Sequence, residues 1–351
     1  MKGTLNFLSK DIFLSTSVIF LIVLSTVILE SIAPSFFPGY FLVIFMAILA
    51  FWFFSQISFE IVSLFSKQLY VLSIFLLVLT LIIGNVTRGT VRWIPIGPLN
   101  LQPAELVRPF LLVFFADFLT KSKITVKRMI QASLLLILPA FLILVQPSLG
   151  VSIVTAIGFV GVLLSSNFNK KYILVGIGVI LVTIPIFWQL MAPYQRQRVM
   201  TFITPTNDPL GAGYNSLESI IAAGSGGFAG RGLGRGIQTQ LSFLPAKQTD
   251  FIFAGVAEEL GFIGAGVMLL ATFIILWRLT VFMENAVNPT ARAYLSGFLF
   301  TYLAQVLVHT GMNMGLLPVT GLPFPLVSAG GSSLLATLIG LGIALGAYRR
   351  W

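Results

Sequence analysis

The sequence contains no cysteine, a single histidine and little charge, since only 9% of its 351 residues are Asp, Glu, Lys or Arg. Without cysteine there is no disulfide framework, no thiol nucleophile and no cysteine-ligated metal. The lone His309 excludes a histidine-rich metal site. Soluble domains carry about 25% charged residues, so this chain has too little polar surface to be covered by water.

The sequence is dominated by long apolar stretches. The chain is 57% hydrophobic and its mean hydropathy is +0.99. Many stretches approach the about 20 apolar residues that cross a bilayer as a helix. The strands of a membrane β-barrel would be about 9–11 residues long and would alternate in polarity. The sequence therefore predicts an all-α polytopic membrane protein.

The apolar stretches predict ten transmembrane helices within one integral membrane domain, residues 1–351. The predicted spans are 13–33, 38–58, 69–86, 103–119, 129–146, 149–166, 172–191, 251–278, 291–313 and 327–347. The first stretch lacks a small-residue cleavage site, so we expect a span and not a removed signal peptide. Connections are short except for residues 192–250, a long extracellular loop between spans seven and eight.

Basic residues indicate the orientation, because cytoplasmic segments of membrane proteins carry an excess of Lys and Arg. That excess is satisfied when both termini are cytoplasmic. It also means that the net charge of +10 reports topology and does not indicate a nucleic-acid partner. Eight of the 21 basic residues nevertheless fall outside, at Arg88, Arg92, Arg108, Arg196, Arg198, Arg231, Arg235 and Lys247.

These outer basic residues have two interpretations. Arg88 and Arg92 could contact lipid headgroups, and Trp93 could be an ordinary interfacial anchor. Alternatively, the outer residues form a wide anion-binding surface, because Arg forks match phosphate oxygens with two N–H groups. Nine glycines between positions 211 and 236 could add backbone N–H donors to it. Their pattern fits neither a Walker A loop nor GxGxxG.

Three groups of polar residues interrupt the outer ends of the predicted spans. Glu105 and Arg108 are three residues apart on one helix face, as a structural ion pair or as the lining of a polar cavity. Asp250 precedes span eight, where it is either a helix N-cap or a general base at the membrane boundary. Glu258 and Glu259 lie deeper and are interpreted as buried framework.

The stretch 315–340 contains three prolines and the run Gly-Gly-Ser-Ser, which includes Ser332 and Ser333. Irregular backbone at membrane depth is tolerated only where it is buried in protein or lines a wet cavity. His309, in the preceding span, is interpreted as a hydrogen-bonded packing residue. The same stretch therefore marks a second place where a polar cavity could form.

Several long stretches resemble the SEDS (shape, elongation, division and sporulation) family in consistent order. They are RWIPIG (92–97), QPAELVRP (102–109), GYNSLESIIAAGSGGFAGRGLGRGIQTQLSFLPAKQTDFIFAGVAEELG (213–261) and GLLPVTGLPFPLVSAGGSSLL (315–335). The resemblance extends from about residue 84 to 345. It implies ten transmembrane helices and polymerisation of lipid II into glycan strands on the outer face of the bacterial cytoplasmic membrane.

The resemblance also assigns residues and a partner. The essential acid of the family falls on Asp250, and its Glu and basic residue fall on Glu105 and Arg108. The implied partner is a class B penicillin-binding protein, a transpeptidase that cross-links the strands. The implied surroundings are membrane lipids, and the nearest members act in cell elongation.

The sequence departs from the family pattern at three positions. The usual Lys is Arg108, which keeps the charge but rarely gives up a proton. The common QPDLG is QPSLG here, with Ser148 in place of an acid, and the common SYGGSS is SAGGSS, with Ala329 in place of Tyr. An acid near residue 148 is therefore expected to be dispensable for the chemistry.

These observations lead to a mechanistic hypothesis for glycosyl transfer. Asp250 would take the proton from the attacking sugar hydroxyl, and Glu105 and Arg108 would orient it or shift its pKa. Basic residues would stabilise the leaving pyrophosphate. The further substrate-binding or supporting candidates are Gln102, Trp93, Arg92, Arg196, Lys247, Ser332 and Ser333.

Three matters stay open on the sequence alone. The sequence contains no compact carboxylate cluster that would indicate a metal site, and it leaves open whether a divalent cation serves as a cofactor. A lipid II flippase would share the fold and the outer cations, but would need polar groups along the whole membrane depth. A non-catalytic scaffold that activates a transpeptidase would need Asp250 only as a helix cap.

Overall fold

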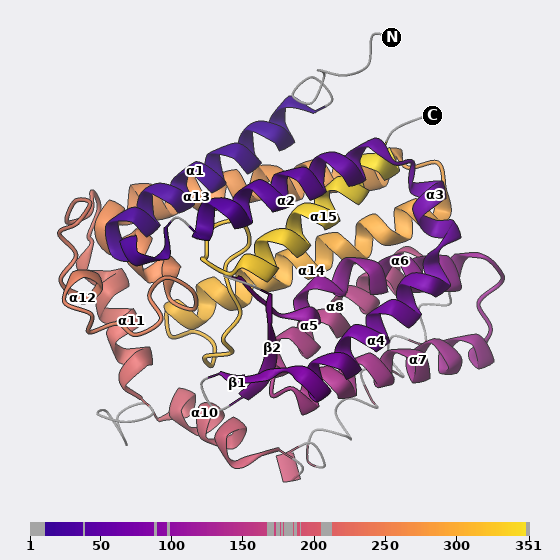
Figure 1. The fold of residues 1–351 in the computed structure, drawn as a ribbon, viewed down its shortest axis with the longest axis horizontal. Coiled ribbons are helices and arrows are strands. Elements are labelled where there is room, and N and C mark those ends of the chain that lie inside the picture. The colour runs from indigo at the N-terminus through magenta and orange to yellow at the C-terminus, as the bar shows by residue number, and fades with distance from the viewer. Residues whose placement is uncertain are drawn as a thin grey trace.

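The computed structural model describes residues 11–348 apart from 38, 88–89, 97–98, most of 167–190 and 205–212. The described chain is mostly helical, and its long helices lie side by side (Figure 1). The first half contains α1 (Ile12–Ile32), η1 (Pro34–Phe36), α2 (Gly39–Gln56), α3 (Phe59–Leu64), α4 (Ser66–Ile83), β1 (Asn85–Thr87), β2 (Thr90–Ile96), β3 (Leu99–Leu101), α5 (Pro103–Leu106), α6 (Arg108–Thr120), α7 (Val126–Val145) and α8 (Leu149–Ser165). The second half contains α10 (Pro193–Ile203), α11 (Tyr214–Ser225), α12 (Ile237–Gln240), α13 (Ile252–Asn285), α14 (Pro289–Asn313) and α15 (Gly331–Tyr348).

Seven helices in the described part of the chain are long and apolar enough to cross a membrane, namely α1, α2, α4, α7, α13, α14 and α15. Each coincides with a predicted span, and α8, with 17 residues, coincides with another. The predicted span 172–191 lies largely outside the described residues. The structure therefore agrees with a multispanning helical membrane protein.

Predicted span four is two helices and not one. The helix that begins at Pro103 ends at Leu106, and α6 begins at Arg108. Proline occupies the first turn of both helices, at 103 and 109, where its missing N–H costs least. The break at Val107 places Glu105 and Arg108 on different elements.

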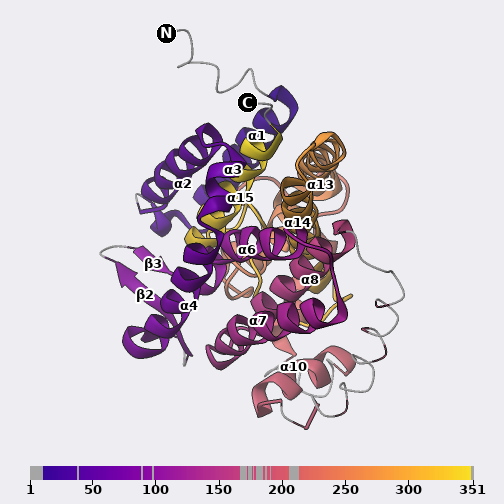
Figure 2. The same cartoon turned by 90° about the vertical axis from the view of Figure 1, so that its right-hand side faces the viewer.

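The expectation of a purely helical chain is wrong for residues 85–101, which form a small antiparallel sheet in the order β1-β2-β3. Val86 pairs with Val91, and Ile94 pairs with Leu101. This stretch is rich in β-branched residues, which favour strands, and pairing between the strands provides hydrogen-bond partners for their backbone groups. Figure 2 shows the sheet beside α2 and α4.

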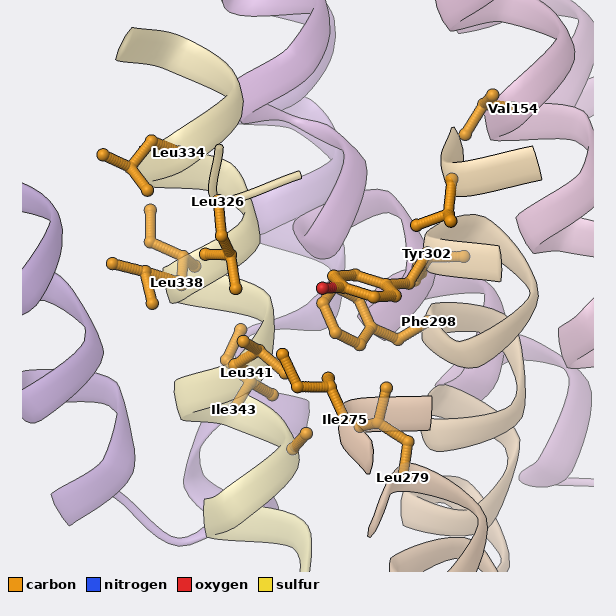
Figure 3. Packing of buried hydrophobic residues seen from close by; sticks show 14 of the residues in the cluster. Val154, Ile275, Leu279, Phe298, Tyr302, Leu326, Leu334, Leu338, Leu341 and Ile343 are labelled. Atoms are coloured by element: carbon orange, nitrogen blue, oxygen red, sulfur yellow. The ribbon is translucent and has the colours of Figure 1, made fainter. Parts of the chain in front are cut away.

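The centre of the bundle is formed by α14 and α15, because 67% and 78% of their most apolar windows are buried, against 17% for α7. Figure 3 shows buried side chains of α13, α14 and α15 in one cluster. Those labelled on these three helices are Leu334, Leu338, Leu341, Ile343, Phe298, Tyr302, Ile275 and Leu279. The helices with exposed apolar faces are those that lipid would cover.

The start of α1 and the end of α15 lie at one end of the molecule, and α11 and α12 lie at the other (Figure 1). At the first end, Asp11 caps α1 by accepting a hydrogen bond from the Leu14 N–H at 2.9 Å. The same carboxylate pairs with Arg278 of α13, whose Nε lies 2.9 Å from Oδ2. This mostly buried pair joins two helices that are far apart in the sequence.

We expect Arg278→Gln to lower the free energy of unfolding by about 3 kcal/mol, because it leaves the buried Asp11 carboxylate without its counter-charge. The matched control is Lys127→Gln, which removes an exposed cation in the first turn of α7. Surface substitutions of this kind usually change the free energy of unfolding by less than about 0.5 kcal/mol. Thermal unfolding of both variants in detergent measures the difference, and equal losses would contradict the argument.

A glycine-rich loop covers the N-terminal part of α13. The carboxylate of Glu258 accepts from the N–H groups of Gln238 and Thr239, at 2.8 and 3.0 Å. The carboxylate of Glu259 accepts from the Ser31 hydroxyl at 2.6 Å and from the Gln240 amide at 2.8 Å. Both acids are fully buried, so their charge is compensated by hydrogen bonds that fasten α12 and α1 to α13.

The same loop meets a break in α13. Gly261 has φ 68° and ψ −164°, which only glycine adopts readily, and it divides the helix in two. Phe262 N–H donates to the carbonyl of Gly227 at 2.9 Å. In return, the Glu259 carbonyl accepts from the N–H of Gly232 at 3.0 Å. The loop therefore supplies the partners that the interrupted helix lacks.

Candidate active site

A cavity of about 320 Å³ lies among α2, β2, α5 and the segments that precede α13 and α15. One side is apolar and comes mainly from α2, with Phe36, Tyr40, Val43, Met46 and, from α15, Leu335. The lining also includes seven of the predicted site residues: Arg92, Trp93, Gln102, Glu105, Asp250, Ser332 and Ser333. Because its lining contains both apolar and charged or polar side chains, the cavity suits an amphiphile with a polar head and an apolar chain.

Asp250 lies one residue before the N-cap of α13, which is Phe251, and the cap makes no side-chain hydrogen bond. The Asp250 N–H donates to the Ala246 carbonyl at 3.0 Å in the preceding turn. Its carboxylate lies beside Gly321, where an added Cβ would be 3.6 Å from Oδ2. Asp250 therefore lines the cavity and lies next to the N-cap of α13, a position that Phe251 itself occupies.

The segment that carries Asp250 is tied to the segment before α15. The Ser328 hydroxyl donates to the carbonyl of Thr249 at 2.7 Å, and the Ala329 N–H donates to the carbonyl of Gln248 at 2.9 Å. These two bonds hold the end of the irregular stretch 314–330 against the residues that precede α13.

Glu105 and Arg108 form a buried ion pair, with Arg108 Nη2 and Glu105 Oε2 3.8 Å apart. Glu105 lines the cavity, whereas Arg108 lies behind that wall and donates from Nη1 to Gln305 Oε1 at 3.0 Å. Glu105 therefore acts as cavity lining, and Arg108 acts as a structural tie to α14. Glu105 and Asp250 border the same cavity.

Gln102, Ser332 and Ser333 connect the cavity walls. The Gln102 N–H donates to Ser332 Oγ at 2.6 Å, and Ser333 Oγ accepts from the Gln305 amide at 3.0 Å. The Gln102 amide also donates to Ser148 Oγ at 3.3 Å. The hydroxyl at position 148 therefore serves as a hydrogen-bond acceptor beside the cavity, a role that needs no acid.

The outer basic residues do not form one surface around the cavity. Arg92 and Trp93 of β2 line it, and Arg88 lies outside the described residues. Arg196, on α10, donates to the carbonyl of Gln189. Lys247 donates to the carbonyl of Thr239, and burial lowers the pKa of its ammonium group.

The remaining outer arginines lie on the loop as well. Arg198 donates to the Val319 carbonyl at 3.3 Å, and Arg231 donates to Ser225 Oγ at 3.2 Å. Arg235 is exposed. Of the predicted anion-binding residues in the described chain, only Arg92 therefore reaches the cavity.

The sequence interpretation missed Tyr40 on the apolar side and two polar residues of α14, Gln305 and Asn313, although it had named His309 of the same helix as a hydrogen-bonded packing residue. The side chains of Gln305, His309 and Asn313 are buried behind the cavity. Their spacing of four residues within an apolar span is a signal that could have identified them. Among the residues that the structure describes, no three His, Cys, Asp or Glu side chains are grouped so that they could hold a metal ion.

Comparison with known proteins identifies the family. The sequence matches the FtsW/RodA/SpoVE family, described as cell cycle proteins, over residues 4–350. The chain belongs to this family. This match covers nearly the whole chain, so it includes both the motifs at the cavity and the helices around them.

Curated relatives carry the name of an enzyme. The chain is 38% identical over 296 residues to the peptidoglycan glycosyltransferase MrdB of Escherichia coli K12, covering 83% of this chain and 80% of that one. It is 36% identical over 286 residues to the probable peptidoglycan glycosyltransferase FtsW of Thiomicrospira cyclica, covering 79% and 72%.

Solved structures of the family have the same fold. A chain of a peptidoglycan synthase complex that coordinates polymerization and crosslinking superposes with a TM-score of 0.83, at 33% identity, covering 96% of this chain and 97% of that chain. The rod shape determining protein RodA of Thermus thermophilus superposes with a TM-score of 0.74, at 29% identity, covering 98% of each chain. These likenesses extend the family assignment to the arrangement of the helices, including those that border the cavity.

Proposed function

We propose that this chain is a peptidoglycan glycosyltransferase that polymerises lipid II into glycan strands on the outer face of the bacterial cytoplasmic membrane. The observation that carries the proposal is the single cavity that combines Asp250, Glu105 and Arg92 with an apolar side along α2. Lipid II has a matching division into sugars, a pyrophosphate and a long lipid tail. The enzyme names of the relatives support the same activity.

In this mechanism, an acceptor sugar hydroxyl attacks the anomeric carbon of the donor. The new carbon–oxygen bond forms as the bond from that carbon to the pyrophosphate oxygen breaks, and the pyrophosphate leaves with the electron pair. Asp250 takes the hydroxyl proton as general base. Arg92 offers the leaving anion a cation that is already in place.

Glu105 and Arg108 support this chemistry from one wall. Glu105 fixes the local charge that Asp250 experiences across the cavity, and Arg108 neutralises Glu105 from behind. Gln102, Trp93, Ser332 and Ser333 complete the lining and contact the substrate. Arg196 and Lys247 take no part in this arrangement, because each binds a backbone carbonyl away from the cavity.

The arrangement in the membrane follows from the same proposal. The chain is a single domain with ten spans, in which α5 and α6 together make the fourth and residues 172–191 the seventh. The end that holds α11 and α12 faces outside, with the loop 192–250, and both termini are cytoplasmic. This orientation places the cavity at the outer boundary, where the sugars of lipid II lie.

The proposed partner is a class B penicillin-binding protein that cross-links the product in cell elongation. Support comes from the 33% identical chain of a solved peptidoglycan synthase complex and from the likeness to RodA. Membrane lipids surround the helices, and the proposal includes no nucleic acid.

The decisive experiment incubates the purified chain and its transpeptidase partner with lipid II. Products are read as glycan ladders on a gel after the transpeptidase has been blocked. The same preparation is tested in proteoliposomes for movement of labelled lipid II between leaflets. We expect polymer; translocation without polymer would indicate a flippase, and neither activity would indicate a scaffold.

Glu105→Gln is expected to reduce the polymerisation rate by roughly 10–100-fold, because it removes the charge opposite Asp250 and leaves Arg108 without a counterion. The matched control is Asp117→Asn on α6, which removes an equally buried carboxylate that pairs with Lys121 at 2.7 Å. Asp117 does not line the cavity. A similar loss of rate per folded molecule in both variants would contradict a role for Glu105 in the site.

A further inference from the structure

One buried face of α14 supports the wall of the cavity from behind. Gln305, His309 and Asn313 are each four residues apart, so their side chains share one face of the helix. All three are buried, at 2%, 0% and 0% exposure. Polar side chains in such a position need hydrogen-bond partners, and the partners show what the face does.

The first two residues hold the wall that surrounds the acids. Gln305 accepts from Arg108 at 3.0 Å and donates to the Pro323 carbonyl at 2.9 Å. The Nδ1 of His309 lies 2.7 Å from the carbonyl oxygen of Leu322. The Arg108 guanidinium and the irregular segment before α15 are therefore both attached to α14.

Asn313 attaches the third part of the wall, the start of α13. Its Oδ1 accepts from the backbone N–H of Ala254 at 3.0 Å. Its Nδ2 donates to the backbone carbonyl of Asp250 at 3.0 Å and to that of His309 at 2.8 Å. Ala254 is in the first turn of α13, where N–H groups have no partner within the helix.

Asn313 is thus a helix cap provided by another helix. Phe251 occupies the N-cap position and has no side chain that could accept a hydrogen bond. A local Ser or Asp at that position would have capped α13 without connecting it to anything. A cap from α14 instead fixes the backbone on both sides of Phe251, including the carbonyl of Asp250, relative to the segment that Gln305 holds.

We infer that Asn313 is a positioning residue for Asp250: its amide sets the direction in which the Asp250 carboxylate enters the cavity. The inference rests on the proposed function, because it gives Asn313 a part in the reaction that Asp250 performs. One face of α14 then sets the position of Asp250 relative to the Glu105–Arg108 pair, because Gln305 binds Arg108 and Asn313 binds the Asp250 carbonyl. Asn313 itself does not line the cavity.

The test compares Asn313→Ala with Ser219→Ala. Ser219, on α11, is fully buried, and its hydroxyl donates to the backbone carbonyl of the same Asn313 at 3.0 Å. Its removal deletes a buried hydrogen bond at this residue but leaves the bonds to Asp250 and Ala254 intact. Each variant is measured with the transpeptidase partner for kcat and KM of lipid II polymerisation, and for thermal unfolding.

We expect Asn313→Ala to lower kcat by roughly 10–100-fold per folded molecule with KM nearly unchanged, because misplacement of a base affects the chemical step more than binding. The acid limb of the pH–rate profile should also shift, since the surroundings of the Asp250 carboxylate change. Ser219→Ala should lower the unfolding temperature but keep kcat and the pH profile of the wild type.

The inference is overturned if Asn313→Ala keeps the wild-type kcat and pH profile, or if both variants lose rate in proportion to their loss of stability. If Asn313→Ala does not fold, Asn313→Leu, which fills the volume but makes neither bond, is judged by the same two outcomes. Wild-type protein in the same assay separates the two proposals. Its failure to polymerise lipid II contradicts the proposed function, whereas normal kcat in the Asn313 variant contradicts only the positioning role.

Discussion

Asp250→Asn is expected to lower the rate of lipid II polymerisation by at least about 100-fold, the contribution that a well-placed general base makes. The amide has the size of the carboxylate but cannot take a proton from the sugar hydroxyl. Because Asn keeps the size of Asp and Phe251, not Asp250, occupies the N-cap position of α13, we expect the variant to remain folded, and its unfolding temperature is measured alongside the rate. Initial rates from glycan ladders, per folded complex, measure the effect.

The matched control for this variant is Glu218→Gln. Glu218 is a half-buried acid on α11 and does not line the cavity. It should keep the wild-type rate. Raising the pH should restore the activity of Asp250→Asn only slightly, since no base replaces the lost carboxylate. A wild-type rate for Asp250→Asn in a folded complex would contradict the assignment of Asp250 and favour the scaffold.

The second large effect is expected on stability, from Gly226→Ala. A Cβ at Gly226 would overlap the carbonyl oxygen of Ala257 and lie 3.0 Å from the Cα of Glu258, both in the backbone of α13. Backbone cannot rotate out of the way as a side chain can. We therefore expect a loss of about 3 kcal/mol, typical of severe overpacking, with the loop displaced from Glu258 and Glu259.

Gly224→Ala, two residues earlier, is the control for that change. No heavy atom lies within 4 Å of a Cβ added there, and the residue is inside α11. Alanine in a helix is more favourable than glycine by about 1 kcal/mol, so this variant should be as stable as the wild type or more so. Thermal unfolding and proteolysis of the loop measure both variants, and equal behaviour would contradict the close packing.

The sequence was sufficient for the seven long apolar helices that the described chain contains and for part of the site. Runs of apolar residues predict membrane helices because the bilayer itself sets their length and polarity. The pairing of Glu105 with Arg108 follows from local spacing, and both Glu105 and Asp250 line the cavity. The nearby break at Val107 follows from proline chemistry that is also visible in the sequence.

Long-range contacts account for what the sequence did not reveal. Residue types alone could not indicate that Glu258 and Glu259 bind the backbone and side chains of a loop. Lys247 counted as part of an outer cationic surface, yet its ammonium group binds the Thr239 carbonyl. The contact of Asn313 with Asp250 spans 63 positions, and no local pattern predicts which helix provides such a cap.

The break in α13 at Gly261 has a mechanical consequence. A continuous helix of 34 residues would be about 50 Å long, well beyond the hydrocarbon thickness of about 30 Å. Membrane helices of excess length tilt as the bilayer thins. Because the helix is interrupted, the part after residue 263 can take a tilt of its own, whereas residues 252–263 are fastened to the loop and to Asn313. We expect this break to take up changes in membrane thickness, so that the distance from Asp250 to the rest of the cavity changes little.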